Sequence, residues 1–265
     1  MPKILEIKKL KRLYKLTFDM TPDALYVCED SVIKFFLSKD KLLSTDQLKE
    51  LTDFDQFARG KSLAIYYLGF KARTEREVVN YLLTHEINSA YLPQILAELK
   101  ALGLLDDSAY AENFIHGKIA LNAAGPYQIR QKLREKGLAD EILDQKLAEL
   151  FDESTQLKVA GKLAEKLIRS KAHRLPLKQL KIKITQSLVN KGFSYDIAQQ
   201  TLDKLELEAD EETENSLLLR ELDKVASKYS RNYEGYELKN KVTQALMRKG
   251  FDYSAIRDAV DNYEF

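Results

Sequence analysis

The feature that most constrains the fold of this chain is a short sequence pattern that occurs three times. The segments QKLREKGLADEIL, QSLVNKGFSYDIA and QALMRKGFDYSAI each place a Gln and a Leu ahead of a Lys-Gly pair and an apolar residue after it. Their glycines, Gly137, Gly192 and Gly250, lie 55 and 58 residues apart. Self-similarity at such a spacing is typical of chains built from tandem structural units.

The residues before each Lys-Gly pair predict a helix with one apolar face. Apolar residues recur there at four-residue intervals, the spacing of a single helix face. The positions are Leu180, Ile184 and Leu188; Leu238, Val242 and Leu246; and Ile129 and Leu133. A glycine after such a helix can take the left-handed conformation that ends it, and the preceding basic residue complements the helix dipole. A second helix is then expected over Asp140–Leu150, Tyr195–Leu205 and Ser254–Tyr263.

A more divergent fourth copy lies upstream. Val78 and Leu82 occupy the apolar positions, Glu86 stands where the glycine would be, and the next helix is expected over Tyr91–Leu102. Each unit also has a predicted first helix, so that each contains three helices. These first helices are Lys61–Leu68, Ser108–Leu121, Gln156–Arg169 and Asn215–Ser230.

The sequence therefore predicts a mostly α chain of tandem three-helix, helix-turn-helix-like repeats forming an elongated array. The predicted repeats are residues 58–105, 106–152, 153–207 and 208–265. The connectors expected between helices are Asn122–Gly125, Lys171–Pro176 and the acidic segment Glu206–Glu214, which we expect to be a flexible joint. Residues 1–57 differ and predict a small α+β cap. Its expected strands are Ile4–Ile7, Leu13–Phe18 and Ala24–Cys28, with a Pro22-Asp23 turn, and its expected helices are Asp30–Leu37 and Ser44–Leu51, with Ser44 or Thr45 as N-cap.

Charge is segregated along the chain although the net charge is only +1. The segment Lys158–Lys183 holds nine basic residues and one acid, and Asp203–Glu214 holds seven acids and one Lys. The first fifteen residues are also basic. Such runs often form a solvated face, but blocks of opposite sign also suit electrostatic docking to a charged partner.

The residues offer no catalytic set, and we expect the chain not to be an enzyme. His85, His116 and His173 have no helical pairing for a metal, and Cys28 is the single cysteine, interpreted as a packed thiol. No phosphate-binding loop, dinucleotide fingerprint or nucleophile elbow occurs. The pair Asp106-Asp107 is better explained by helix capping than by acid–base chemistry. We therefore predict no cofactor and no metal.

Two further interpretations concern surroundings. No stretch approaches the roughly 20 apolar residues of a membrane span, and the basic N-terminus lacks an apolar core, so we expect a cytoplasmic protein. We also expect the free chain to be a monomer. Several tyrosines, such as Tyr66, Tyr127 and Tyr236, lie among basic residues. They can stack on nucleobases or simply pack at helix edges, and both readings stay open.

Three segments in order resemble the RecX family. The first is Ala64–Leu68 followed by Arg73–Val78; the second is Gly103–Asp107 with Tyr110, Ala111, Phe114 and Ile115; the third is Gly125–Ile129 with Leu133, Lys136 and Gly137. Together they cover about residues 60–150, and the repeats up to residue 265 are similar to longer members from low-GC Gram-positive bacteria. The chain departs from the pattern at Thr74, where Ser is commoner, at Leu105, where Ile is usual, and at His116-Gly117, near a position that often carries Arg.

The resemblance implies a regulator of the RecA recombinase. Members of this family bind RecA–DNA filaments along the helical groove and limit filament growth, ATP hydrolysis and strand exchange, which links them to recombination, DNA repair and the SOS response. The expected partner is the RecA filament, with weak single- or double-stranded DNA binding in addition. A standalone DNA-binding helical repeat protein is the alternative, and a peptide-binding scaffold of 34-residue repeats fits the spacing poorly.

Basic residues near the repeat helices are the predicted partner contacts, expected to face acidic filament surface or DNA phosphate. They are Arg73, Arg76, Arg130, Lys132, Arg134, Lys136, Lys178, Lys181, Lys183, Arg248 and Lys249. Nothing in the sequence marks a base-reading set of Arg, Asn or Gln on a single helix, so we expect direct DNA binding to be weak, directed at the backbone and dependent on salt.

Overall fold

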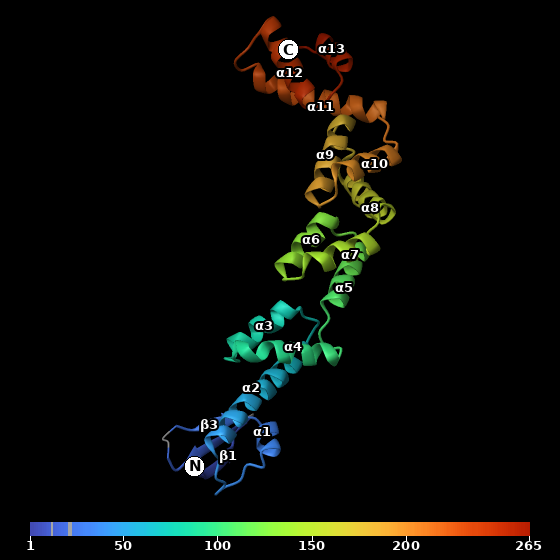
Figure 1. Ribbon diagram of the computed structural model, residues 1–265. Helices are drawn as coiled ribbons and strands as arrows, with labels where there is room; N and C mark the ends of the chain where they lie inside the picture. Colours follow the sequence, from blue (N-terminus) through green and yellow to red (C-terminus); the bar gives the residue numbers. More distant parts are fainter. Residues whose placement is uncertain (12, 21–22) are drawn as a thin grey trace. The chain divides into compact units, whose positions relative to one another are not determined.

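The computed structural model describes residues 1–11, 13–20 and 23–265. Its helices and strands confirm a mostly helical chain with a small antiparallel sheet at the N-terminus (Figure 1). The chain divides into two compact units, which we describe separately. The first contains Met1–Glu112 and Leu133–Leu143, and the second contains Asn113–Lys132 and Asp144–Phe265.

The first unit begins with a three-stranded sheet in the order β1-β2-β3. β1 (Ile4–Lys9) pairs antiparallel with β2 (Tyr14–Phe18), which pairs antiparallel with β3 (Leu25–Val27). The three predicted strands are confirmed; Pro22 of the predicted turn lies outside the described residues. Ile4, Leu16 and Val27 point into a core that α1 (Glu29–Lys34) and α2 (Thr45–Leu68) complete. α1 ends before the predicted Leu37, and Phe36 just beyond it takes a positive φ.

α2 is one helix of 24 residues, where the sequence predicted two separate helices, Ser44–Leu51 and Lys61–Leu68. Ser44 and Gln47 form the capping box that begins it, which confirms Ser44 as the N-cap. Gly60 lies in the helix interior, and a larger side chain would not fit there because an added Cβ would lie 2.4 Å from Cδ1 of Ile95. The predicted boundary between residues 57 and 58 therefore falls inside a helix that serves both the sheet and the first repeat (Figure 1).

The first repeat packs the end of α2 against α3 (Glu75–Thr84), a 3-10 turn η1 (Ser89–Tyr91) and α4 (Leu92–Ala101). Its core includes Ala64, Val78 and Leu82, which are fully buried. Glu86 has a φ of 62°, so it does take the left-handed place predicted for a glycine. The second repeat contributes α5 (Asp107–Ala120), α6 (Pro126–Glu135) and α7 (Asp140–Leu150), and the division between the units passes through all three helices.

The second unit holds the third and fourth repeats. α8 (Glu153–Lys171), α9 (Leu177–Asn190) and α10 (Tyr195–Leu205) pack on one another. α11 (Glu211–Tyr229), α12 (Gly235–Arg248) and α13 (Tyr253–Asp261) form a separate core around Leu222, Val242 and Ile256. Glu211–Glu214 belongs to α11, so the predicted acidic joint is shorter than expected. The predicted domain limits stay a proposal.

Candidate functional site

In the second, third and fourth repeats a Lys-Gly turn joins the second helix to the third. Gly137, Gly192 and Gly250 have φ values of 90°, 91° and 92°, which confirms the predicted left-handed helix ends. Each turn also contacts the start of the middle helix of the preceding repeat. An added Cβ would lie 2.2 Å from Cδ of Arg76, 2.5 Å from the amide nitrogen of Gln128 and 2.7 Å from Cγ of Gln179, respectively. Only glycine permits this close approach. We call each of these contacts a turn latch.

The first turn latch joins α3 to the turn at Lys136-Gly137, within the first unit. The buried Thr74 hydroxyl donates to the carbonyl of Lys136 over 2.8 Å, and Lys136 Nζ lies 2.8 Å from Oε1 of Glu77. Thr74 and Glu77 also form the capping box of α3, so Thr74 caps the helix as the commoner Ser would. Although burial opposes it, the hydrogen bond from Lys136 and those of the capping box hold the pKa of Glu77 below its usual value.

The second turn latch joins α6 to the turn at Lys191-Gly192, within the second unit. The amide of Gly125 donates to the Lys191 carbonyl over 2.7 Å, and that of Tyr127 donates to the Gly192 carbonyl over 3.1 Å. The side-chain amide of Gln128 donates to the carbonyl of Asn190 over 2.7 Å. Main-chain donors at the start of α6 are thus satisfied by the following repeat.

The third turn latch joins α9 to the turn at Arg248-Lys249-Gly250, through a 3.4 Å hydrogen bond from Gln179 Nε2 to the Arg248 carbonyl. Glu77, Gln128 and Gln179 hold the same position in their repeats, directly before the first buried apolar residue of each middle helix. The side chains of all three reach the turn of the following repeat. The equivalent positions of these three residues can be read from the aligned repeats. Their contacts, however, join residues 59 to 69 positions apart and were not predicted.

Carboxylates of the following repeat cap two of the middle helices. Asp107 accepts a hydrogen bond from the amide of Glu75 at the start of α3, and Glu214 accepts one from the amide of Leu177 at the start of α9. Asp106 accepts one from the amide of Ala109 and so caps α5. These contacts favour the capping interpretation of Asp106-Asp107 over an acid–base pair.

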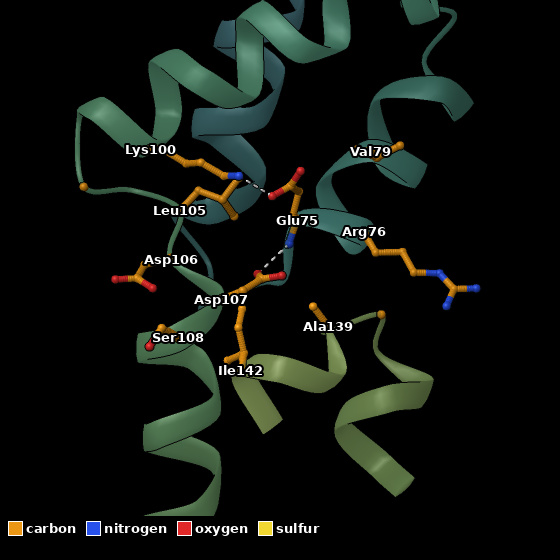
Figure 2. Close-up of a pocket in the computed structure, with 12 residues that line it drawn as sticks. Glu75, Arg76, Val79, Lys100, Leu105, Asp106, Asp107, Ser108, Ala139 and Ile142 are labelled. Atoms are coloured by element: carbon orange, nitrogen blue, oxygen red, sulfur yellow. Dashed lines mark hydrogen bonds and ion pairs between the residues drawn. The ribbon is translucent and has the colours of Figure 1, made fainter. Parts of the chain in front are cut away.

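Figure 2 shows the cavity of about 810 Å³ beside these carboxylates, in the first unit. Lys100 pairs with Glu75, and Glu75 in turn donates its amide to Asp107, whereas Arg76 extends away from both acids. Burial raises the pKa of Asp107 above its usual value. The carboxylates are engaged by main-chain and lysine donors, so the cavity presents no free acid–base pair.

The models of known families match this chain in three places. The model described as "RecX, third three-helix domain" matches residues 154–202 and again residues 212–260, and the one described as "RecX, second three-helix domain" matches residues 106–147. A protein named "Regulatory protein RecX" from Lactococcus lactis subsp. cremoris (strain SK11) is 53% identical over 267 residues, covering 100% of this chain and 99% of the relative. The chain belongs to the RecX family.

Other relatives agree with this assignment. A "Regulatory protein RecX" from Streptococcus pneumoniae (strain Hungary19A-6) is 44% identical over 261 residues, covering 98% of this chain and 99% of its own length. A crystal structure of regulatory protein RecX is 32% identical, with a TM-score of 0.60, and covers 77% of this chain and all of its own. The structure of RecX from Lactobacillus salivarius is 33% identical, with a TM-score of 0.55, and covers 58% of this chain and 99% of its own. The double match of one model confirms that the third and fourth three-helix units of this RecX chain are alike.

Several predicted contact residues have partners inside the RecX chain. Arg130 pairs with Asp144, Arg134 with Asp140, Lys136 with Glu77, and Lys249 with Glu221. Arg73 lies over the ring of Tyr67 at 4.1 Å, and its buried Nε has no hydrogen-bond partner. Tyr67 stacks on Tyr81 with ring centroids 4.0 Å apart. These cations already stabilise the fold, and their role toward a partner stays a prediction.

The remaining predicted contacts have no acid within salt-bridge distance among the described residues. They are Arg76, Lys132, Lys178, Lys181, Lys183 and Arg248. Lys178 and Lys181 lie about 140° and 160° around the α9 axis from Lys183, at 100° per residue. The three lysines therefore do not share one face of α9, and the structure does not bring them together as a single patch.

The described residues contain no group of three or more His, Cys, Asp or Glu placed to hold a metal ion. Cys28 is half-buried beside Ser31, and burial raises the pKa of its thiol, as expected of a packed rather than reactive cysteine. Within the part of the chain that the structure describes, none of the helices has both the length and the apolar character needed to cross a bilayer.

Proposed function

We propose that this chain regulates the RecA recombinase by binding along RecA–DNA filaments in the cytoplasm and limiting their growth, ATPase activity and strand exchange. Membership of the RecX family supports this role, because its relatives are named regulatory proteins. The regulator acts by binding rather than by turnover. The predicted repeat limits at residues 58, 106, 153 and 208 are part of this proposal.

The observation that carries the proposal is the repetition of an exposed position. The second residue of the middle helix is exposed in every repeat, as Arg76, Tyr127, Lys178 and Tyr236. Each of the first three lies beside a turn latch. Modules that carry similar contact positions can each bind one subunit of a repeating partner, and linked weak contacts add up to a useful affinity.

Titrating the chain into RecA ATPase assays on single-stranded DNA tests this function. We expect inhibition at well below one copy per RecA subunit if growth at filament ends is blocked, and inhibition near equal ratios if the interior is bound. Unchanged ATPase activity at a molar excess would contradict the proposal. A gel shift without RecA tests the alternative, since tight DNA binding with no effect on RecA would favour a standalone DNA-binding protein.

A further inference from the structure

One face of α9 lines two neighbouring hollows in the second unit. Gln179, Lys183, Gln186 and Asn190 recur at three- and four-residue intervals and so lie on the same side of this helix. A hollow of about 410 Å³ lies between this face and the end of α8, and one of about 230 Å³ lies between it and Gln128. Lys183 and Gln186 line both hollows, which joins them into one α9 groove.

The α9 groove is cationic, and no Asp or Glu lines it. Lys171, Arg174 and Lys183 line the larger hollow, and Lys183 and Lys191 line the smaller one. By contrast, Glu75, Asp106 and Asp107 line the cavity of Figure 2, and Glu211, Glu214 and Asp252 line the hollow between α9 and α11. The α9 groove is therefore a place where a polyanion meets basic side chains without facing a carboxylate.

Amide and aromatic side chains accompany these cations. Gln186 and Asn190 carry amides along the floor of the groove, and Gln128 closes one side. At the end near Gly192, Tyr127 is 71% exposed and Tyr195 is 68% exposed. The main chain of Tyr127 is held there by the hydrogen bond from its amide to the Gly192 carbonyl, and its ring lies outside the two hollows, beside Gln128 in sequence. Cations that track a backbone, beside aromatic rings on which bases stack, are the features by which proteins bind single strands of nucleic acid.

We propose that the α9 groove binds a single strand of nucleic acid, with its phosphates on Arg174, Lys183 and Lys191 and a base on Tyr127. The groove face from Gln179 to Asn190 is about 16 Å long at 1.5 Å per residue, which is the length of about five nucleotides stacked as in one strand of a duplex, at about 3.4 Å each. An acidic protein surface fits less well, because protein interfaces are centred on apolar side chains and this groove is lined mainly by polar ones.

This inference rests on the proposed function and places the nucleic-acid binding that the family resemblance implies in the α9 groove, where it can be tested without RecA. Binding of a fluorescein-labelled oligo(dT) of 15 nucleotides to the full chain is measured by anisotropy between 25 and 200 mM salt. The test variant is K183Q/K191Q, which removes two charges from the groove. The matched control is K178Q/K181Q, which removes two charges from the same helix on faces away from Lys183.

We expect K183Q/K191Q to weaken binding on the order of tenfold and to lower the salt slope by about 1.4, since each single-strand phosphate contact contributes about 0.7. K178Q/K181Q should change affinity less than twofold, and Tyr127→Ala should weaken binding without changing the slope. Equal losses of affinity in the two double variants would contradict binding in the α9 groove, because affinity would then depend only on the total charge of the chain. Absence of oligo(dT) binding by the unaltered chain, or tighter binding of a duplex of equal length, would also overturn it.

RecA ATPase inhibition by the same variants separates the two proposals. If K183Q/K191Q lost inhibition while the unaltered chain bound no oligo(dT), the α9 face would contact the recombinase, and the nucleic-acid assignment would be wrong while the proposed function stood. If oligo(dT) bound in the groove and RecA were never inhibited, the proposed function would be wrong instead.

Discussion

The hydroxyl of Thr74 donates a hydrogen bond to the main-chain carbonyl of Lys136, 62 residues further along the chain. The same hydroxyl accepts a hydrogen bond from the amide of Glu77 and so caps the N-terminal end of α3. One buried side chain thereby caps a helix and fastens the following repeat to it. The contact with the following repeat was not predicted from the sequence.

Replacing Thr74 with Val should loosen both the α3 cap and the first turn latch. Val is similar in shape but has no hydroxyl, so the Glu77 amide and the Lys136 carbonyl lose a partner, at a cost of about 1 to 3 kcal/mol. Hydrogen exchange of the full chain should show faster exchange over α3, with α12 unchanged. Thr74→Ser keeps the hydroxyl and serves as the control. Equal exchange in Thr74→Val and the unaltered chain would show that the hydroxyl carries no stabilising contact.

Gly192 should be far less tolerant of alanine than Gly161. Gly192 has a positive φ, and an added Cβ would lie 2.5 Å from the amide nitrogen of Gln128, so Gly192→Ala should destabilise the second unit by roughly 1 to 3 kcal/mol. Gly161 lies inside α8 with nothing within 4 Å of an added Cβ. Gly161→Ala should therefore raise stability by about 0.5 to 1 kcal/mol through helix propensity.

Thermal unfolding followed by circular dichroism compares these two glycine variants directly. The expected result is a lower midpoint for Gly192→Ala and a slightly higher one for Gly161→Ala. If both variants shifted the midpoint in the same direction, the second turn latch would not be the close contact that the structure shows.

The first turn latch should weaken in acid. The folded-state pKa of Glu77 is below its usual value near 4.5, so the carboxylate contributes stability that is present above that value and is lost as the pH falls through the lower folded pKa. Glu77→Gln, which supplies the residue type found at Gln128 and Gln179, removes this contribution. The variant should be less stable than the unaltered chain at pH 7, and the difference should become smaller as the pH falls below 4.5.

Urea unfolding at pH 7, 5 and 3 measures this difference. Other carboxylates with lowered pKa values, such as Asp152 and Asp252, titrate in both proteins and cancel in the comparison. A stability difference that stays constant from pH 7 to pH 3 would mean that the Glu77 charge contributes nothing to the latch.

The repeat pattern predicted most of the helices because its signals are local. Glycine after an apolar helix face fixes where a helix ends, and Gly137, Gly192 and Gly250 behave as predicted. Helix limits were less well predicted, because two predicted helices form the single helix α2, α1 ends before Leu37, and the acidic joint is shorter than expected. Gly60 lies inside α2, where the sequence predicted two separate helices, and Ile95 of α4 leaves no room there for a larger side chain.

The predicted contact residues were less well resolved by sequence, because charge along a chain does not say which cations are paired in space. Arg130 and Lys249 were predicted as partner contacts, but each pairs with a carboxylate 14 or 28 residues away. Lys183 was grouped with Lys178 and Lys181 by proximity in sequence, although helical geometry separates them. Gln186 and Asn190 were missed because uncharged amides gain meaning only from the groove that they line.

Substitutions at Arg73 and Arg76 can distinguish a cation that stabilises the fold from one that is available to a partner. Arg73 covers the Tyr67 ring, which stacks on Tyr81, whereas Arg76 is exposed and pairs with no carboxylate in the described chain. Arg73→Met should lower the stability of the first unit by about 1 kcal/mol, the size of a partly buried cation–π contact. Arg76→Met keeps the stem that packs on Gly137 and should leave stability unchanged. RecA inhibition measured at 10 °C below the unfolding midpoint of each variant should then be reduced by Arg76→Met and preserved by Arg73→Met. The opposite result would mean that Arg73 contacts the partner and that its stacking on Tyr67 occurs only in the free chain.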